Sequence, residues 1–156
     1  MSFLYLLEGI RCPFLDRLFS LITELGGETL YMAVAIAVYW CVSKGLGYYI
    51  LTTGFVGTIA NQFLKLCFRI PRPWVLDPDF SIVESARAGA TGYSFPSGHT
   101  QNAFSSFGCL GMWAKGGWRA LCFAIVVLIG FSRMYLGVHT PLDVGVAFVL
   151  GLVLML

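Results

Sequence analysis

Three basic residues and two histidines lie at the ends of apolar segments, where ionisable side chains are costly and rarely idle. The basic residues are Lys65, Arg72 and Arg133, and the two histidines of the chain are His99 and His139. Each cation alone is as compatible with snorkelling to lipid headgroups as with function. Three cations that converge with both histidines need a common anion, because otherwise they repel one another and lose hydration. A phosphate group carries about −1.5 to −2 charges and three acceptor oxygens, which suits this set.

The first histidine stands at a predicted helix start. Pro96-Ser97-Gly98-His99 directly precedes an apolar run. Free amide groups and the positive end of the helix dipole make such a start an anion site. Gly98 permits close backbone approach. Ser97 is an ordinary helix cap, a phosphate ligand, or both.

The second histidine is followed by another predicted helix start, with Thr140 and then Pro141 in its favoured first position. Asp143 comes four residues after His139, near enough to hydrogen-bond the imidazole. Such a bond fixes the tautomer and leaves the other ring nitrogen as the better nucleophile or base.

This set of side chains offers what phosphoryl transfer requires, namely positioning, charge stabilisation and proton handling. It does so without a metal ion, and the nearby acidic residues are too sparse and scattered for a two-metal cluster. We therefore predict neither a metal nor a cofactor.

Composition indicates where these residues lie. The chain of 156 residues is 58% hydrophobic and only 12% charged, whereas soluble domains carry about 25% charged residues. Soluble globular, disordered and coiled-coil proteins are thereby excluded. One integral membrane domain over residues 1–156 is predicted. The net charge of +2 gives no support for a nucleic-acid partner.

Five apolar stretches predict helices, because backbone in hydrocarbon must satisfy its own hydrogen bonds. They cover residues 28–43, 46–69, 98–114, 118–136 and 141–156. The predicted fold class is an all-α, polytopic transmembrane helical bundle of about five to six helices.

The two ends of the sequence lead to separate predictions. Residues 13–25 have the pattern of an N-terminal amphipathic helix lying in the membrane interface, and the alternative is a tilted first span that includes 3–12. The sequence stops inside an apolar run. Either that run packs as a short helix or, as we expect, the chain is the front part of a longer protein.

Charge in the connections predicts the orientation. Lys44, Lys115 and Arg119 occupy two short turns without acidic residues, which favours a cytoplasmic location for that face. The long polar connection 70–97 then lies on the extracytoplasmic side, and a loop of that length is usually functional. For 75–92 the alternative is a plain solvated connector. A bacterial cytoplasmic membrane is the expected location, with the site facing outward.

The residues above resemble the motifs of the type 2 phosphatidic acid phosphatase (PAP2) superfamily, which also includes vanadium haloperoxidases. The family motifs are K-x6-R-P, P-S-G-H and S-R-x5-H-x3-D. In this sequence they are matched in order and at the same spacing by Lys65 to Arg72-Pro73, by Pro96-Ser97-Gly98-His99, and by Ser132-Arg133 to His139 to Asp143.

The resemblance implies a role for each matched position. His139 would be the nucleophile that forms a phosphohistidine, and Asp143 would orient it. His99 would protonate the leaving oxygen and then activate water. The phosphate would be bound by Lys65, Arg72, Ser97, Gly98 and Arg133.

The same resemblance implies hydrolysis of a lipid phosphate or diphosphate, such as a polyprenyl (di)phosphate, phosphatidate, phosphatidylglycerol phosphate or sphingoid phosphate. The expected partners are that substrate and membrane lipids, and no oligomeric state is predicted. Vanadate-dependent halide oxidation at the same site is one alternative, but the haloperoxidases that the chain resembles are soluble. A non-catalytic scaffold or lipid transporter is another, against which the complete motifs argue.

Overall fold

All residues, 1–156, are described by the computed structural model, and every regular element is helical. The helices are α1 (Ser2–Gly9), α2 (Pro13–Glu24), α3 (Glu28–Cys41), α4 (Lys44–Phe68), the short α5 (Pro73–Leu76), α6 (Gly98–Ala103), α7 (Cys109–Trp113), α8 (Gly117–Tyr135) and α9 (Pro141–Met155). A 3₁₀ turn η1 covers Glu84–Ala86, and a π-helical turn η2 (Phe104–Gly108) joins α6 to α7. The five apolar stretches are therefore helical, each within two residues of its predicted start.

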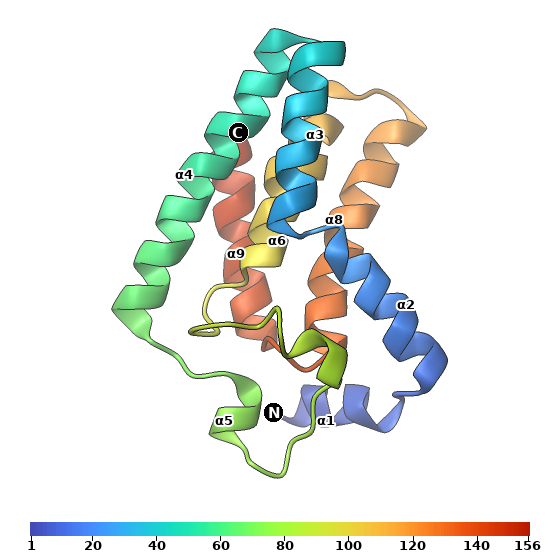
Figure 1. Cartoon of the computed structure of the whole chain (residues 1–156), viewed down its shortest axis with the longest axis vertical. Helices are drawn as coiled ribbons and strands as arrows, with labels where there is room; N and C mark the ends of the chain where they lie inside the picture. Colours follow the sequence, from blue (N-terminus) through green and yellow to red (C-terminus); the bar gives the residue numbers. More distant parts are fainter.

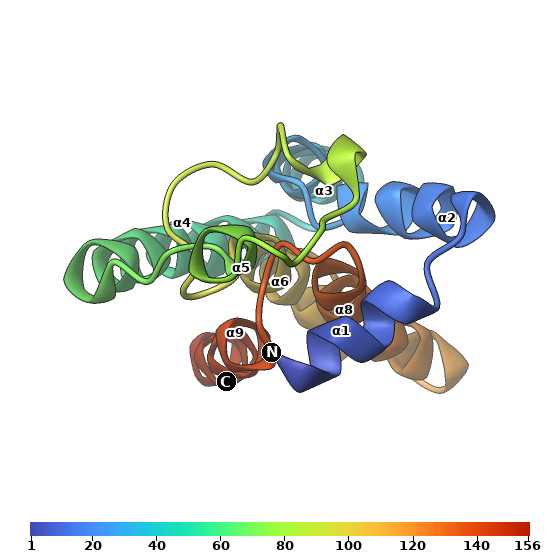
Figure 2. The same cartoon turned by 90° about the horizontal axis from the view of Figure 1, so that it is seen from below.

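The central helix of the bundle is the one that begins with α6. Figure 2 shows α6 surrounded by α3, α4, α8 and α9, and it contacts all four. Its apolar residues join the largest buried cluster of the protein, which includes Ala103, Phe104 and Cys109 from this helix. The start of α6 is thus fixed from every side, which a catalytic residue at that position requires.

Glycines let the outer helices approach closely. A Cβ on Gly54 of α4 would lie 2.0 Å from the Tyr31 hydroxyl on α3, and one on Gly151 of α9 would lie 2.4 Å from the ring of Phe104. No larger side chain fits at either contact.

The predicted helix starts are capped as expected. The Ser97 hydroxyl accepts a bond from the Thr100 amide at the start of α6. At the start of α9, Thr140 and Asp143 bond to each other's backbone amides in a capping box. Both histidines therefore lie beside rigid helix N-termini.

By length and hydropathy, α8 could cross a membrane on its own, and α2 with α3, bent by 45°, forms a second candidate if the pair is one span. Helix α2 rises from the lower end of the bundle in Figure 1 to the point where α3 begins. Residues 2–9 form a separate helix, and the chain leaves the helical conformation before Pro13. The alternative of a first span that continues from 3–12 into 13–25 is therefore not observed. The interfacial location of 13–25 stays a prediction.

The connections divide between the two ends of the bundle. The short turns α3–α4 and α7–α8 lie together at one end in Figure 1, and the long connection from α4 to α6 lies at the other, with α1 and α5. Lys44, Lys115 and Arg119 are thus separated from the predicted site by the length of the bundle.

Candidate active site

One pocket of about 200 Å³, without any hydrophobic lining side chain, collects most of the predicted site. Its lining includes six predicted residues, namely Lys65, Arg72, Gly98, His99, Arg133 and His139. These come from α4, the long connection, α6, α8 and the turn before α9. Segments separated by more than seventy residues in sequence therefore meet around a single polar space.

Arg72 is held by backbone oxygens of the long connection. It is 6% exposed, and its guanidinium donates to the Gly92 carbonyl at 3.1 Å and the Thr91 carbonyl at 2.7 Å. Burial lowers the pKa of Arg72 to about 10, with Asp143 opposing the shift, so the side chain stays charged at neutral pH. The alternative that 75–92 is a plain solvated connector is wrong, because this segment supplies these acceptors and part of the pocket wall.

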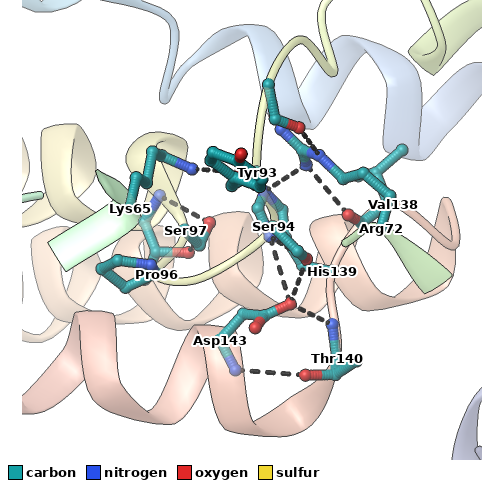
Figure 3. Close-up of polar contacts among 12 residues, drawn as sticks. Lys65, Arg72, Tyr93, Ser94, Pro96, Ser97, Val138, His139, Thr140 and Asp143 are labelled. Carbon is teal, nitrogen blue, oxygen red and sulfur yellow. Dashed lines mark hydrogen bonds and ion pairs between the residues drawn. The ribbon is translucent and has the colours of Figure 1, made fainter. Parts of the chain in front are cut away.

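The tautomer of His139 follows from its contact with Arg72. Nη1 of Arg72 lies 3.0 Å from Nε2 of His139 (Figure 3). A guanidinium only donates hydrogen bonds, so Nε2 is the acceptor and Nδ1 is assigned the proton. On the Nδ1 side, Asp143 Oδ2 and Ser94 Oγ each lie 3.4 Å away. The nitrogen that carries the electron pair is therefore the one that faces Arg72.

His139 is also kept neutral. It is 2% exposed, and burial holds its pKa well below the ordinary value. The hydrogen bond with Asp143 opposes the shift, whereas the Arg133 and Arg72 charges reinforce it. A neutral imidazole is the form that can act as a nucleophile.

Asp143 is fixed by more than its histidine. The same Oδ2 accepts from the Thr140 amide at 2.7 Å and from the Ser94 hydroxyl (Figure 3). Ser94 is fully buried, and the sequence motifs do not identify it as a site residue. No spacing rule marks a lone serine in a loop, and only its place two residues before Pro96 could have drawn attention to it.

The other two cations are held by neutral oxygens. Nη1 of Arg133 donates to the Thr23 hydroxyl at 2.8 Å, while its buried Nε has no partner. Nζ of Lys65 donates to the Tyr93 carbonyl at 2.6 Å. The ion pairs of the protein are Arg87–Glu84 and His139–Asp143, so no carboxylate lies within 4.0 Å of the three cations.

Ser97 lies at the helix start, as predicted, but outside the pocket lining. It is completely buried and does not line the pocket. Its hydroxyl accepts from the Thr100 hydroxyl at 2.9 Å as well as from the Thr100 amide. The sequence left three interpretations of Ser97, namely a helix cap, a phosphate ligand or both, and the contacts show the cap. The Gly98 backbone reaches the pocket.

Several lining residues were not singled out as ligands from the sequence. They are polar, lie on the first turn of α3, on α4 and on α6, and include Glu28, Thr58, Asn61, Gln62, Gln101 and Asn102. Polar residues at these positions within apolar helices are the signal that could have found them.

Comparison with known proteins shows the family to which this chain belongs. The model of the PAP2 superfamily matches residues 43–156, which is most of the chain. The chain belongs to the PAP2 superfamily. The resemblance drawn from the three motifs is thereby confirmed, and with it the prediction of a phosphatase family.

Two curated relatives come from Bacillus subtilis (strain 168). Undecaprenyl-diphosphatase BcrC is 33% identical over 103 residues, which cover 65% of this chain and 50% of BcrC. Phosphatidylglycerophosphatase B is 29% identical over 160 residues, covering 93% of this chain and 74% of that protein. A probable sphingosine-1-phosphate phosphatase of Dictyostelium discoideum is 28% identical, covering 88% of this chain and 36% of its own length. The match thus spans only half of BcrC, the first of these relatives.

Two solved structures share the fold. The crystal structure of Aquifex aeolicus LpxE superposes with a TM-score of 0.87 at 29% identity, covering 99% of this chain and 90% of that chain. The transmembrane PAP2-type phosphatidylglycerolphosphate phosphatase from Bacillus subtilis gives 0.83 at 27% identity, covering 99% and 79%. The all-α fold is confirmed, and likeness to a transmembrane enzyme supports an integral membrane protein.

Proposed function

We propose that this protein is a lipid phosphatase that hydrolyses a lipid phosphate or diphosphate through a phosphohistidine, without a metal ion, at the extracytoplasmic membrane face. One observation carries the proposal. Three cations without a carboxylate partner line the same polar pocket of about 200 Å³ as a neutral histidine, and one of them, Arg72, contacts its acceptor nitrogen. An anionic ligand balances these charges, and the histidine is placed to attack it.

The first step forms the covalent intermediate. Nε2 of His139 attacks the phosphorus, and the bond between phosphorus and the lipid oxygen breaks with its electron pair on that oxygen. The bound phosphate offsets the Arg133, Arg72 and Lys65 charges that disfavour protonation of His99. The protonated ring gives the leaving oxygen its proton, so a lipid alcohol leaves, or a lipid monophosphate if the substrate is a diphosphate. Lys65, Arg72 and Arg133 stabilise the charge on the equatorial oxygens.

The second step restores the enzyme. His99, now neutral, removes a proton from water, and the hydroxide attacks the phosphorus. The phosphorus–nitrogen bond breaks with its electron pair returning to Nε2. Inorganic phosphate leaves, and both histidines regain their starting protonation.

The test is phosphate release from a panel of lipid phosphates by the purified chain in detergent, with bromide oxidation assayed in parallel. We expect His139→Ala to lose at least about 10³-fold in rate and to form no acid-quenched phosphoenzyme, because the nucleophile is gone. Activity should persist in excess EDTA. Wild-type turnover by His139→Ala would contradict the assignment of His139 as the nucleophile. Bromide oxidation without phosphate release indicates the haloperoxidase alternative, and neither activity indicates a scaffold or transporter.

A further inference from the structure

The part of the pocket nearest α3 and α4 has a different chemistry from the phosphate end. Here the lining residues are Glu28 at the start of α3, Thr58 on α4 and Gln101 on the central helix. Glu28 is the one acidic residue that lines the pocket. A carboxylate opposes phosphate binding, so its presence in the same pocket as three cations requires another reason.

Gln101 supplies an independent sign of a ligand. The side chain is 1% exposed, yet neither its amide nitrogen nor its amide oxygen has a hydrogen-bond partner. The amide lies against α4, because a Cβ on Gly57 would be 2.5 Å from Nε2. Burying an unpaired amide is costly, and a ligand that offers both a donor and an acceptor removes that cost.

Glu28 and Thr58 also belong to a second cavity. This apolar groove of about 550 Å³ lies between α3 and α4, with Met32, Leu51 and Phe55 in its lining. It follows α4 from Thr58 to Tyr48, a distance of about 15 Å at 1.5 Å per residue. The groove therefore adjoins the phosphate pocket at the two shared residues.

Because the two cavities adjoin, each part of a lipid phosphate has a place in them. With the phosphate among the cations and the hydrocarbon chain in the groove, the group that joins them lies beside Glu28. A carboxylate favours a hydroxyl or ammonium there and repels a second phosphate.

We propose that Glu28, Thr58 and Gln101 form a headgroup subsite that selects lipid monophosphates with a hydroxyl or ammonium group next to the phosphate, over prenyl diphosphates. The proposal rests on the proposed phosphatase function. It bears on a choice that the relatives leave open, since their names specify a diphosphate in one case and monophosphates of glycerol-based or sphingoid lipids in the others.

The experiment compares matched substrates with the full chain in detergent. Lysophosphatidate carries a free hydroxyl near its phosphate, its deoxy analogue lacks that hydroxyl, and farnesyl diphosphate carries a second phosphate. For the wild-type protein we expect kcat/KM for lysophosphatidate to exceed that for the deoxy analogue by about tenfold, because a site built to bond a hydroxyl discriminates against its absence. Glu28→Gln should reduce that preference and raise the relative rate on farnesyl diphosphate about fivefold to tenfold. Gln101→Leu should reduce the hydroxyl preference only.

Glu84→Gln is the matched control, since Glu84 is an exposed glutamate outside the pocket that pairs with Arg87. It should leave all three rates unchanged. Thermal midpoints equal to that of the wild type would exclude misfolding of the variants. Equal wild-type rates on lysophosphatidate and its deoxy analogue, or substrate ratios unaltered by Glu28→Gln, overturn the subsite. Absence of phosphate release from every substrate overturns instead the phosphatase function on which it rests.

Discussion

His139 is held at both ring nitrogens, by a cation at one and by a carboxylate and a hydroxyl at the other. The carboxylate of Asp143 is itself held by the Thr140 amide and the Ser94 hydroxyl. Orientation of His139, the proposed nucleophile, therefore involves a serine outside the three motifs. Precise orientation of a reacting group is worth a large part of a rate enhancement.

Replacing Ser94 with alanine tests this dependence. We expect kcat to fall about tenfold with little change in KM, because one hydrogen bond to a charged group is lost while the phosphate ligands remain. Ser106→Ala is the control, since that buried hydroxyl donates to the Asn102 carbonyl at 2.8 Å and has no hydrogen bond with His139, Asp143 or Ser94. Steady-state phosphate release measures both. An unaltered kcat in Ser94→Ala would show that Asp143 does not require the hydrogen bond from Ser94.

The lowered pKa of His139 also predicts how stability depends on pH. Burial keeps the ring neutral in the folded protein, whereas the unfolded chain protonates it near pH 6.5. Below that pH the unfolded state binds more protons, so stability is greatest above pH 6.5 and is lost as the pH falls. The thermal midpoint should fall between pH 7 and pH 5, and less so in His139→Gln. Equal slopes for the two proteins would contradict a neutral, buried histidine.

The broken helix pair α2–α3 supplies parts of the site from outside the region that the family model matches. At the break, a Cβ on Gly26 would lie 2.7 Å from the His99 carbonyl oxygen. The junction of α2 and α3 therefore packs directly against the start of α6. From α2, the Thr23 hydroxyl accepts a bond from Arg133. The N-terminal helices therefore contact Arg133 and His99, two residues of the candidate site, in addition to any role at the membrane.

Thr23 allows this contribution to be measured. Thr23→Val keeps the shape but removes the acceptor, so kcat should fall about tenfold and vanadate should inhibit less well. Thr23→Ser keeps the hydroxyl and should behave like the wild type. If valine and serine variants have the same kcat, α2 acts by packing alone.

The molecule as a whole is polarised along its long axis. Basic turns without acidic residues lie at one end, and the long connection, which supplies part of the candidate pocket's lining, lies at the other. Exposed cysteines mark both ends, because Cys12 precedes α2 and Cys41 closes α3 beside the turn that holds Lys44. This arrangement permits a direct test of orientation.

Single-cysteine variants that retain only Cys12 or only Cys41 should differ in labelling by a membrane-impermeant maleimide. On intact spheroplasts we expect Cys12 to react and Cys41 to react only after lysis, because positive turns stay in the cytoplasm. Labelling is read by mass shift on a gel. The opposite pattern would place the active site on the cytoplasmic side.

The sequence determined those features that depend on local pattern. Apolar runs located the helices to within two residues at their starts, and capping residues marked where His99 and His139 lie. Motif spacing identified Lys65, Arg72 and Arg133 as partners, since three cations in apolar surroundings demand one anion. The roles assigned to these residues stay predictions until the variants are assayed.

Tertiary structure alone decided the contacts between distant segments. Thr23 and Arg133 are 110 positions apart, and Ser94 and Asp143 are 49 apart, so no periodicity links them. Whether Ser97 faces the pocket or the helix, and which polar residues of α3, α4 and α6 share the pocket, depends on how helices rotate as they pack. That rotation is set by close contacts such as Gly54 on Tyr31, whose energy exists only when both helices are in place.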